Sequence, residues 1–269
     1  QLFLEIATNA TDQSARPGTN VRNIRVTMDA TTGEITVWND GQSIPVRMHR
    51  QLTDKYLTTV IFSEFRCGSN FDDEQKRTGA GRNGYGAKCT MTWSKRATVE
   101  HNDGEHHFTQ TWHDNLSRVD APVVRKSKRK STFTQVAFTL DYARLGVTDI
   151  LAAIDYLRSF VWHLGVVTDP KVSVFLDGKK LPVRGLRDYA KILSPDPAAV
   201  VYDEGENMQV AVCPVRPGAS TWSCGFVNGI PCHAGSHVNF ALNRVRDIIN
   251  GGKGAKTCSL ATLKGQITV

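Results

Sequence analysis

A glycine-rich segment, residues 77–91, constrains the fold of this chain more than any other feature of its sequence. It reads RTGAGRNGYGAKCTM, with four glycines in eight residues among basic and amide side chains. Glycine allows positive φ and close approach to the main chain, and a run of free N–H groups in such a loop forms a concavity for anions. Residues 85–93 are predicted to form a helix whose N-terminus points into the loop, which also favours phosphate. The segment therefore predicts a loop that covers nucleotide phosphates.

Two common phosphate-binding patterns do not fit this segment. Residues 79–84 have the glycine spacing of the dinucleotide fingerprint, but that pattern must follow a strand, and residues 72–77 are a charged stretch. Residues 81–86 have the spacing of a P-loop, but Ala87 is inserted before Lys88. The remaining alternative is a flexible loop without a ligand. The glycine-rich segment alone does not distinguish such a loop from a phosphate-binding loop.

The N-terminal residues 1–13 are predicted to form an amphipathic helix, because apolar residues recur there at helical spacing. Glu5, Asn9 and Asp12 form one polar stripe on another face of this helix. Such a stripe is usually solvated. In a pocket, however, a carboxylate can handle a water molecule and an amide oxygen can bind a hard cation.

Two alternating segments, residues 24–28 and 34–39, are predicted to form paired strands joined by a turn. Ile35 and Val37 define the inward face of the second strand, and Asn39 is in phase with them. A buried asparagine must find hydrogen-bond partners. They are supplied either by the protein core or by the edge of a ligand.

The rest of the chain predicts a mixed α/β protein with two domains, residues 1–194 and 195–269, divided where Ser194 and two prolines interrupt the pattern. The helix at 149–164 is expected to bury Leu151 and to stop at Gly165, and the last helix to bury Ile249. The expected elements are strands at 97–101, 106–112 and 134–140, a helix at 149–164, a hairpin at 172–183, a helix at 187–193, strands near 208–215 and 221–229, and a helix at 237–249.

The composition sets wide bounds on partners. A net charge of +7 and a pI near 9.2 permit a polyanionic partner. The basic run at 125–130 is interpreted as a solvated hairpin tip, with DNA contact and nuclear import as alternatives. No apolar run approaches the ~20 residues that span a membrane, so no membrane partner is expected. The six cysteines include no C-x-x-C pair and are expected to be free thiols. A zinc set made of Cys224, Cys232, His233 and His237 is disfavoured, because its spacing matches no standard site.

Taken together, the motifs resemble the Bergerat ATP-binding fold. More narrowly, they resemble the ATPase gate of type IIA DNA topoisomerases of the eukaryotic and large-DNA-virus kind. The segments that carry this resemblance are the Glu5-x3-Asn9 helix, residues 38–46 (WNDGQSIPV) and residues 81–88 (GRNGYGAK), with further likeness at 68–73, 110–115, 176–183 and 225–230.

The resemblance implies a fold and an activity. The fold is an α/β two-layer sandwich, a mixed sheet covered by helices on one face, followed by part of a second α/β domain, the transducer. The activity is ATP-driven closure of a homodimeric gate that supports passage of double-stranded DNA. The location is the nucleus if the source is cellular, or a viral factory or virion if it is viral.

The resemblance also assigns roles to residues. Glu5 would polarise the attacking water, Asn9 would hold Mg²⁺, and Asn39 would contact the adenine amine of ATP. Asp40 and Gly41 would shape that end of the pocket, and Ser69 and Asn70 would contact the ribose and phosphates. The residues expected to wrap the triphosphate are Arg82, Asn83, Gly84, Tyr85, Gly86 and Lys88, and the nucleotide-binding set is completed by Asp12, Gly81, Ala87 and Thr134.

Several features depart from the family pattern. Ser43 replaces the second glycine of the adenine-side motif, and residues 78–81 contain one inserted residue. The family's transducer lysine and N-terminal strap are not recognised, which predicts weak turnover by this chain alone. Two alternatives remain: a mismatch-repair or chaperone ATPase of the same fold, and a nucleotide-binding dimerisation module without turnover. Glu5 argues against the second, since a pure binder needs no base.

Overall fold

The chain divides into two compact units, Gln1–Leu181 and Pro182–Val269. The structure is a computed structural model, and it describes residues 1–64, 85–206, 208–216, 223–232, 234–251 and 267–268. The predicted boundary after Ser194 therefore lies 13 residues later than the observed division. The reason is that the helix at 186–193 packs on a strand of the second unit, through Ala190, Ala211 and Cys213.

The first unit is built on a mixed sheet with the strand order β5-β4-β3-β7-β2-β1-β8-β9, in which β6 also pairs with β4. The β1–β8 pair is parallel, and the other pairs are antiparallel. Its strands are β1 (Asn23–Met28), β2 (Glu34–Asp40), β3 (Ser94–Asn102), β4 (His106–His113), β5 (Arg118–Val119), β6 (Val123–Lys126), β7 (Phe133–Leu140), β8 (Ser173–Leu176) and β9 (Lys179–Lys180).

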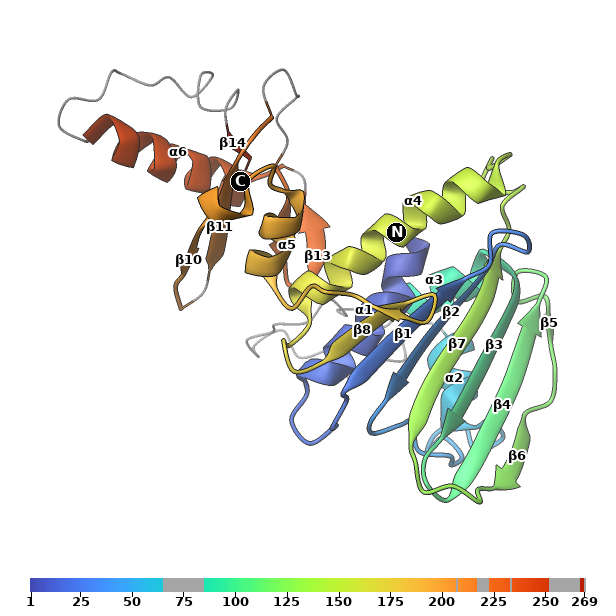
Figure 1. Ribbon diagram of the computed structural model, residues 1–269. Helices are drawn as coiled ribbons and strands as arrows, with labels where there is room; N and C mark the ends of the chain where they lie inside the picture. The colour runs from blue at the N-terminus through green and yellow to red at the C-terminus, as the bar shows by residue number, and fades with distance from the viewer. Residues whose placement is uncertain (65–84, 207, 217–222, 233, 252–266, 269) are drawn as a thin grey trace. The chain divides into compact units, whose positions relative to one another are not determined.

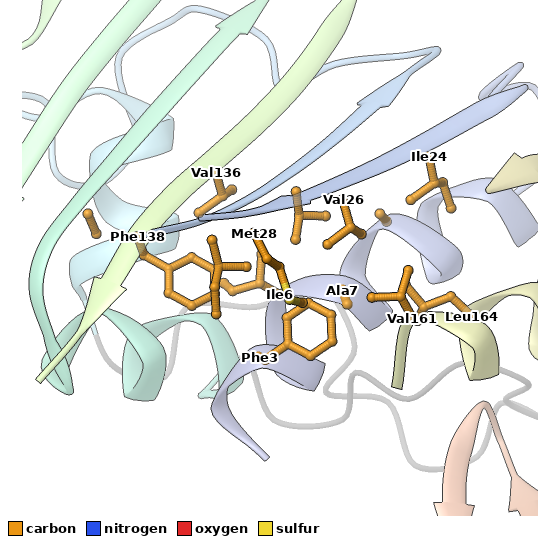
Figure 2. Close-up of a cluster of buried hydrophobic side chains, with 14 of the residues drawn as sticks. Phe3, Ile6, Ala7, Ile24, Val26, Met28, Val136, Phe138, Val161 and Leu164 are labelled. Carbon is orange, nitrogen blue, oxygen red and sulfur yellow. The ribbon is translucent and has the colours of Figure 1, made fainter. Parts of the chain in front are cut away.

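Helices cover one face of this sheet, which confirms the predicted two-layer arrangement (Figure 1). They are α1 (Leu2–Ala15), α2 (Leu57–Ser63), α3 (Gly86–Thr92) and α4 (Ile150–Val167). Apolar side chains of α1, α4 and the strands meet between the layers, as Figure 2 shows for Phe3, Val26 and Phe138. On the opposite face Arg25 stays exposed, and its guanidinium lies 4.5 Å from the ring centre of Trp38.

Helix α4 begins as expected but ends later than expected. The Asp149 carboxylate caps it by accepting a hydrogen bond from Ala152 N at 2.9 Å. The helix then continues through the buried Gly165 to Val167, because tertiary packing overrides the local stop signal. Leu151, expected to face inward, is 57% exposed.

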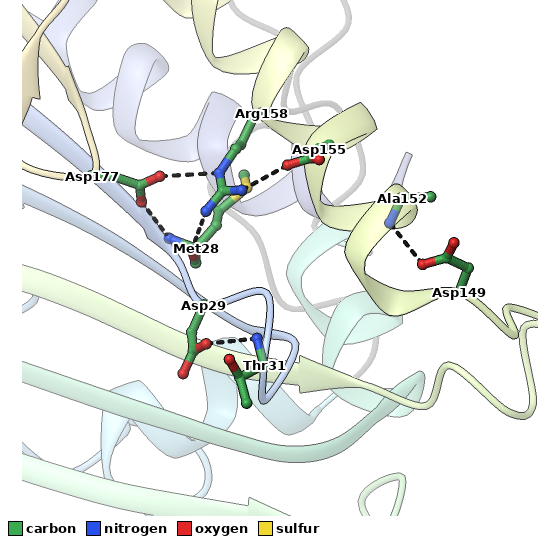
Figure 3. A network of polar contacts seen from close by, with 8 residues as sticks. All are labelled: Met28, Asp29, Thr31, Asp149, Ala152, Asp155, Arg158 and Asp177. Carbon is green, nitrogen blue, oxygen red and sulfur yellow. Dashed lines mark hydrogen bonds and ion pairs between the residues drawn. The ribbon is translucent and has the colours of Figure 1, made fainter.

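Among the described helices, α4 alone is long and apolar enough, by length and composition, to cross a membrane. Its buried side chains nevertheless belong to the core of the first unit. Arg158 also ties it to the sheet, since its guanidinium donates to Asp177 Oδ2 at 3.0 Å, to Asp155 Oδ1 at 2.7 Å and to Met28 O at 2.8 Å (Figure 3). These are the contacts of a core helix.

The second unit contains the elements α5 (Leu186–Leu193), η1 (Pro197–Ala199), β10 (Val201–Glu204), β11 (Gln209–Pro214), β12 (Gly225–Val227), β13 (Ile230–Cys232), α6 (Ser236–Gly251) and β14 (Ile267–Thr268). The expected strand near 221–229 is instead the short hairpin β12–β13. In α6 the predicted residues Val238 and Leu242 are buried, but Ile249 is 39% exposed. The predicted inward stripe therefore holds only for the first half of this helix.

Candidate functional site

The polar stripe of α1 meets the beginning of α3. Glu5 is half-buried on α1, and its Oε1 accepts a hydrogen bond from Gln1 Nε2 at 2.6 Å. A Cβ atom added to Gly86 would lie only 2.0 Å from Glu5 Oε2, so the close approach of the two helices requires glycine there. Thr90 Oγ1 donates to Leu2 O at 2.9 Å and fastens the same two helices. Glu5, the predicted general base, therefore lies against α3, which is formed by the last part of the glycine-rich segment.

The other residues predicted for the phosphate end are only partly brought together. On α1, Asn9 is exposed and Asp12 is half-buried. Tyr85 lies just before α3, and Lys88 on α3 is 1% exposed. The predicted residues Ser69, Asn70, Gly81, Arg82, Asn83 and Gly84 lie outside the residues that the structure describes.

The donor set on α1 suits a hard cation. Asn9 presents an amide to solvent one helical turn after the Glu5 carboxylate, and oxygen donors of these types are the ones that Mg²⁺ accepts. Over the described parts of the chain there is no group of three His, Cys, Asp or Glu side chains that could hold a metal ion. Cys224, Cys232 and His237 accordingly form no such group among the described residues, and His233 lies outside them.

The opposite end of the candidate site is formed by a row of side chains across neighbouring strands. Asn39 on β2 pairs with Thr134 on β7, and Thr134 pairs with His101 on β3. Directly opposed residues of antiparallel strands point to the same face. Asn39 is 6% exposed, in phase with Ile35 and Val37, which confirms the predicted inward position. Its Nδ2 donates to Asp40 O at 2.9 Å.

Asp40 and Gly41 fix the backbone at the end of β2. Asp40 Oδ1 accepts from the backbone N–H groups of Arg22 and Asn23 at 2.7 and 2.8 Å, and its Oδ2 accepts from Asn23 Nδ2 at 2.6 Å. Gly41 has a φ of 90°, and a Cβ there would lie 2.5 Å from Thr19 O. Both residues thus shape this end of the site through the protein's own chain.

A buried polar network adjoins Asn39, and the sequence motifs did not reveal it. Ser43 Oγ lies 3.1 Å from Thr134 Oγ1 and 3.3 Å from His101 Nδ1, and Thr58 Oγ1 on α2 lies 2.8 Å from His101 Nε2. Burial lowers the pKa of His101 to about 4, so its imidazole is neutral at physiological pH. One signal in the sequence pointed to this network. His101 continues the inward-facing alternation of Ala97 and Val99, so it is a lone polar residue on an apolar strand face.

Comparison with known proteins identifies the family. The model of the histidine kinase-, DNA gyrase B- and HSP90-like ATPases matches residues 1–144. DNA topoisomerase 2 of Drosophila melanogaster is 32% identical over 256 residues, which is 91% of this chain and 17% of that protein. DNA topoisomerase 2 of Caenorhabditis elegans is 30% identical over 255 residues, which is 91% of this chain and 16% of that protein. The chain therefore spans only a small part of these relatives.

Solved structures show the same likeness over nearly the whole chain. The ATPase region of Saccharomyces cerevisiae topoisomerase II has a TM-score of 0.81 and 27% identity, covering 99% of this chain and 71% of that one. The ATPase and transducer domains of DNA topoisomerase II from Balamuthia mandrillaris have a TM-score of 0.79 and 30% identity, covering 99% and 70%. The chain belongs to the histidine kinase-, DNA gyrase B- and HSP90-like ATPase family, with the fold of a type II topoisomerase ATPase region.

Proposed function

We propose that this chain binds and hydrolyses ATP as the gate of a type IIA DNA topoisomerase. The observation that carries the proposal is the placement of Glu5 against Gly86, at the start of the helix that holds Lys88. This placement brings the Glu5 carboxylate, which can accept a proton from water, next to the glycine-rich segment, whose composition is typical of a phosphate-binding loop. Family membership and the likeness to topoisomerase ATPase regions support the same function.

The residues divide the chemistry between them. Glu5 accepts a hydrogen bond from the attacking water and takes its proton as the water oxygen bonds to the γ-phosphorus of ATP, while the bond between that phosphorus and the bridging oxygen breaks and ADP leaves with the oxygen. The amide oxygen of Asn9 would hold Mg²⁺, which would supply positive charge near the phosphate oxygens. Tyr85, Ala87 and Lys88 bind the phosphates from the start of α3. Phosphoryl transfer depends mainly on positioning and charge, which suits a site with one carboxylate and many donors.

The adenine base of the nucleotide binds at the row of side chains formed by Asn39, Thr134 and His101 on neighbouring strands. The orientation of the Asn39 amide is set by its bond to Asp40 O, which directs the nitrogen to the protein backbone. Oδ1 is then the acceptor for the exocyclic amine of adenine. Thr134 lies beside Asn39 and is half-buried, so its hydroxyl can also reach a ligand.

The wider activity is proposed from the relatives. In the full-length enzyme two copies of this region close as a homodimer when ATP binds, and closure supports passage of one DNA duplex through another. The nucleus is the expected location in a cell, and a viral factory or virion if the source is viral. The mismatch-repair and chaperone alternatives are not favoured, because the similar proteins found are DNA topoisomerases.

The decisive experiment compares binding with turnover. Calorimetry with a non-hydrolysable ATP analogue and Mg²⁺ should show one nucleotide bound per chain, and a phosphate-release assay with ATP should show slow but measurable turnover. Binding without any turnover would support the alternative of a dimerisation module. A chain that binds no nucleotide would contradict the proposed function.

A further inference from the structure

The polar network beside Asn39 contains Thr58 and His101, which belong to no nucleotide-binding motif of this chain, and Ser43, which lies within the segment 38–46. Thr58, His101 and Ser43 are all buried, and they come from α2, β3 and the segment after β2. Burying three polar side chains is costly unless each is hydrogen-bonded. The network satisfies them, and it ends at Thr134, at the base end of the site.

The direction of the hydrogen bonds follows from Thr58. Over the described parts of the chain, Thr58 Oγ1 has one hydrogen-bond partner, His101 Nε2 at 2.8 Å. If the imidazole donated to Thr58, the Thr58 hydroxyl proton would be buried without an acceptor, which is unfavourable. Thr58 therefore donates to Nε2. A neutral imidazole carries one proton, so that proton lies on Nδ1.

The remaining bonds are then determined in sequence. His101 Nδ1–H donates to Ser43 Oγ across 3.3 Å, and Ser43 in turn donates to Thr134 Oγ1 across 3.1 Å. The Thr134 oxygen has accepted a bond, so its own proton is available to a ligand. With the opposite tautomer of His101 every bond would reverse, and Thr134 would present only an acceptor.

We propose that Thr58, His101 and Ser43 form a relay that makes Thr134 a hydrogen-bond donor toward the bound base and thereby favours adenine over guanine. Adenine presents an amine donor beside a ring-nitrogen acceptor, which matches the Asn39 acceptor and the Thr134 donor. Guanine presents an oxygen acceptor beside an N–H donor, the reverse pattern. The inference rests on the proposed nucleotide-binding function, and it makes Thr58, His101 and Ser43 positioning residues rather than ligand contacts.

The test uses Thr58→Val, which keeps the shape of the side chain and removes its donor, with Thr58→Ser as the control that keeps the donor. Calorimetry on the whole chain gives Kd values for non-hydrolysable ATP and GTP analogues. Thr58→Val should reduce the preference for ATP by about tenfold, the loss of one oriented hydrogen bond. Thr58→Ser should leave the preference unchanged. An equal loss of affinity for both nucleotides in Thr58→Val would reduce the network to a structural role and overturn the proposal.

Nitrogen-15 NMR of the nucleotide-free chain separates the two hypotheses. The His101 signals should report the Nδ1–H tautomer in the parent and in Thr58→Ser, and a mixture of tautomers in Thr58→Val. The Nε2–H tautomer in the parent would overturn the relay even if ATP binds normally. If instead the parent shows Nδ1–H but binds neither nucleotide, the proposed function fails, and the role in base selection is overturned with it.

Discussion

The two ends of the candidate site are built in different ways. The base end is a row of side chains on three adjacent strands, Asn39, Thr134 and His101, joined by Ser43 from the segment after β2. Asn39, Ser43 and His101 are buried and hydrogen-bonded to the protein. The phosphate end consists of a helical stripe with Glu5 half-buried and Asn9 exposed, placed against the start of α3. The base end is therefore preorganised by the sheet, whereas the phosphate end presents side chains that a nucleotide and its cation would hold in place.

This difference predicts where substitutions affect folding and where they affect only chemistry. Changes at the base end remove partners from buried polar groups and should reduce stability as well as binding. Changes on the exposed stripe of α1 should leave stability nearly unchanged and act on turnover.

The largest effect on stability is expected from Gly41→Ala at the base end. The new Cβ would lie 2.5 Å from Thr19 O and 2.8 Å from Val21 N, both backbone atoms, and φ is 90°. We expect a loss of about 3 kcal/mol or more in the free energy of unfolding, measured by denaturant titration. Gly18→Ala is the matched control, because φ is 80° there but no atom lies within 4 Å of the new Cβ. It should lose only about 1 kcal/mol, and equal losses would contradict the close-packing explanation.

A loss of stability of similar size is expected when the pH is lowered, because His101 is buried in its neutral form. Its pKa is lowered from 6.5 to about 4, chiefly by burial, with Asp103 opposing and His107 reinforcing the shift. Above pH 6.5 both the folded and the unfolded chain hold His101 neutral. Between pH 6.5 and 4 only the unfolded chain takes up the proton, so stability falls by about 1.4 kcal/mol per pH unit and about 3 kcal/mol in total.

The measurement for His101 is denaturant unfolding at several pH values, on the parent and on His101→Gln. The variant should be less stable at pH 7, but its stability should fall less steeply below pH 6.5. Parallel pH profiles would show that His101 is not the group that titrates.

A smaller effect is expected from Asn39→Ala, which removes the proposed acceptor for the adenine amine. ATP affinity should fall by about tenfold or more, since an unmet hydrogen-bonding partner costs roughly 1–3 kcal/mol. The preference over GTP should fall with it. Asn239→Ala, at an exposed position of α6, is the control and should bind as the parent does. Unchanged ATP affinity in Asn39→Ala would make Asn39 a core amide only.

The smallest effect is expected from replacing Lys126, Lys128, Arg129 and Lys130 with glutamine. The loop is held through its backbone, since Asn102 Nδ2 donates to Arg129 O at 3.1 Å and to Ser131 O at 2.6 Å. We expect unchanged nucleotide affinity and an unchanged salt dependence of any binding to duplex DNA. A log–log slope reduced by about 0.9 per lost contact would show instead that this loop touches DNA phosphates.

The sequence predicts the polar stripe of α1 and the inward position of Asn39 because both signals are local. Glu5 and Asn9 are one helical turn apart, so their common stripe follows from helix periodicity alone. The inward position of Asn39 likewise follows from alternation along β2. These patterns depend on neighbours within a few residues, and the structure confirms the positions on the helix and strand that they predict.

The buried polar network of Thr58, His101, Ser43 and Thr134 could not be predicted in the same way, because its residues come from four separate segments of the chain. His101 meets Ser43 and Thr58 only after the sheet has paired β3 with β7 and α2 has packed on it. The errors have the same origin. Gly165 continues α4, and the helix at 186–193 joins the second unit, because tertiary packing outweighs the local signal.

The proposed role of Glu5 on the attacking water is tested most directly by Glu5→Gln. We expect this variant to bind a non-hydrolysable ATP analogue as the parent does, to unfold at the same denaturant concentration, and to hydrolyse ATP ~10²–10⁴-fold more slowly. Glu105→Gln, at an exposed position outside the site, should match the parent in all three measurements. Near-normal turnover in Glu5→Gln would contradict the account.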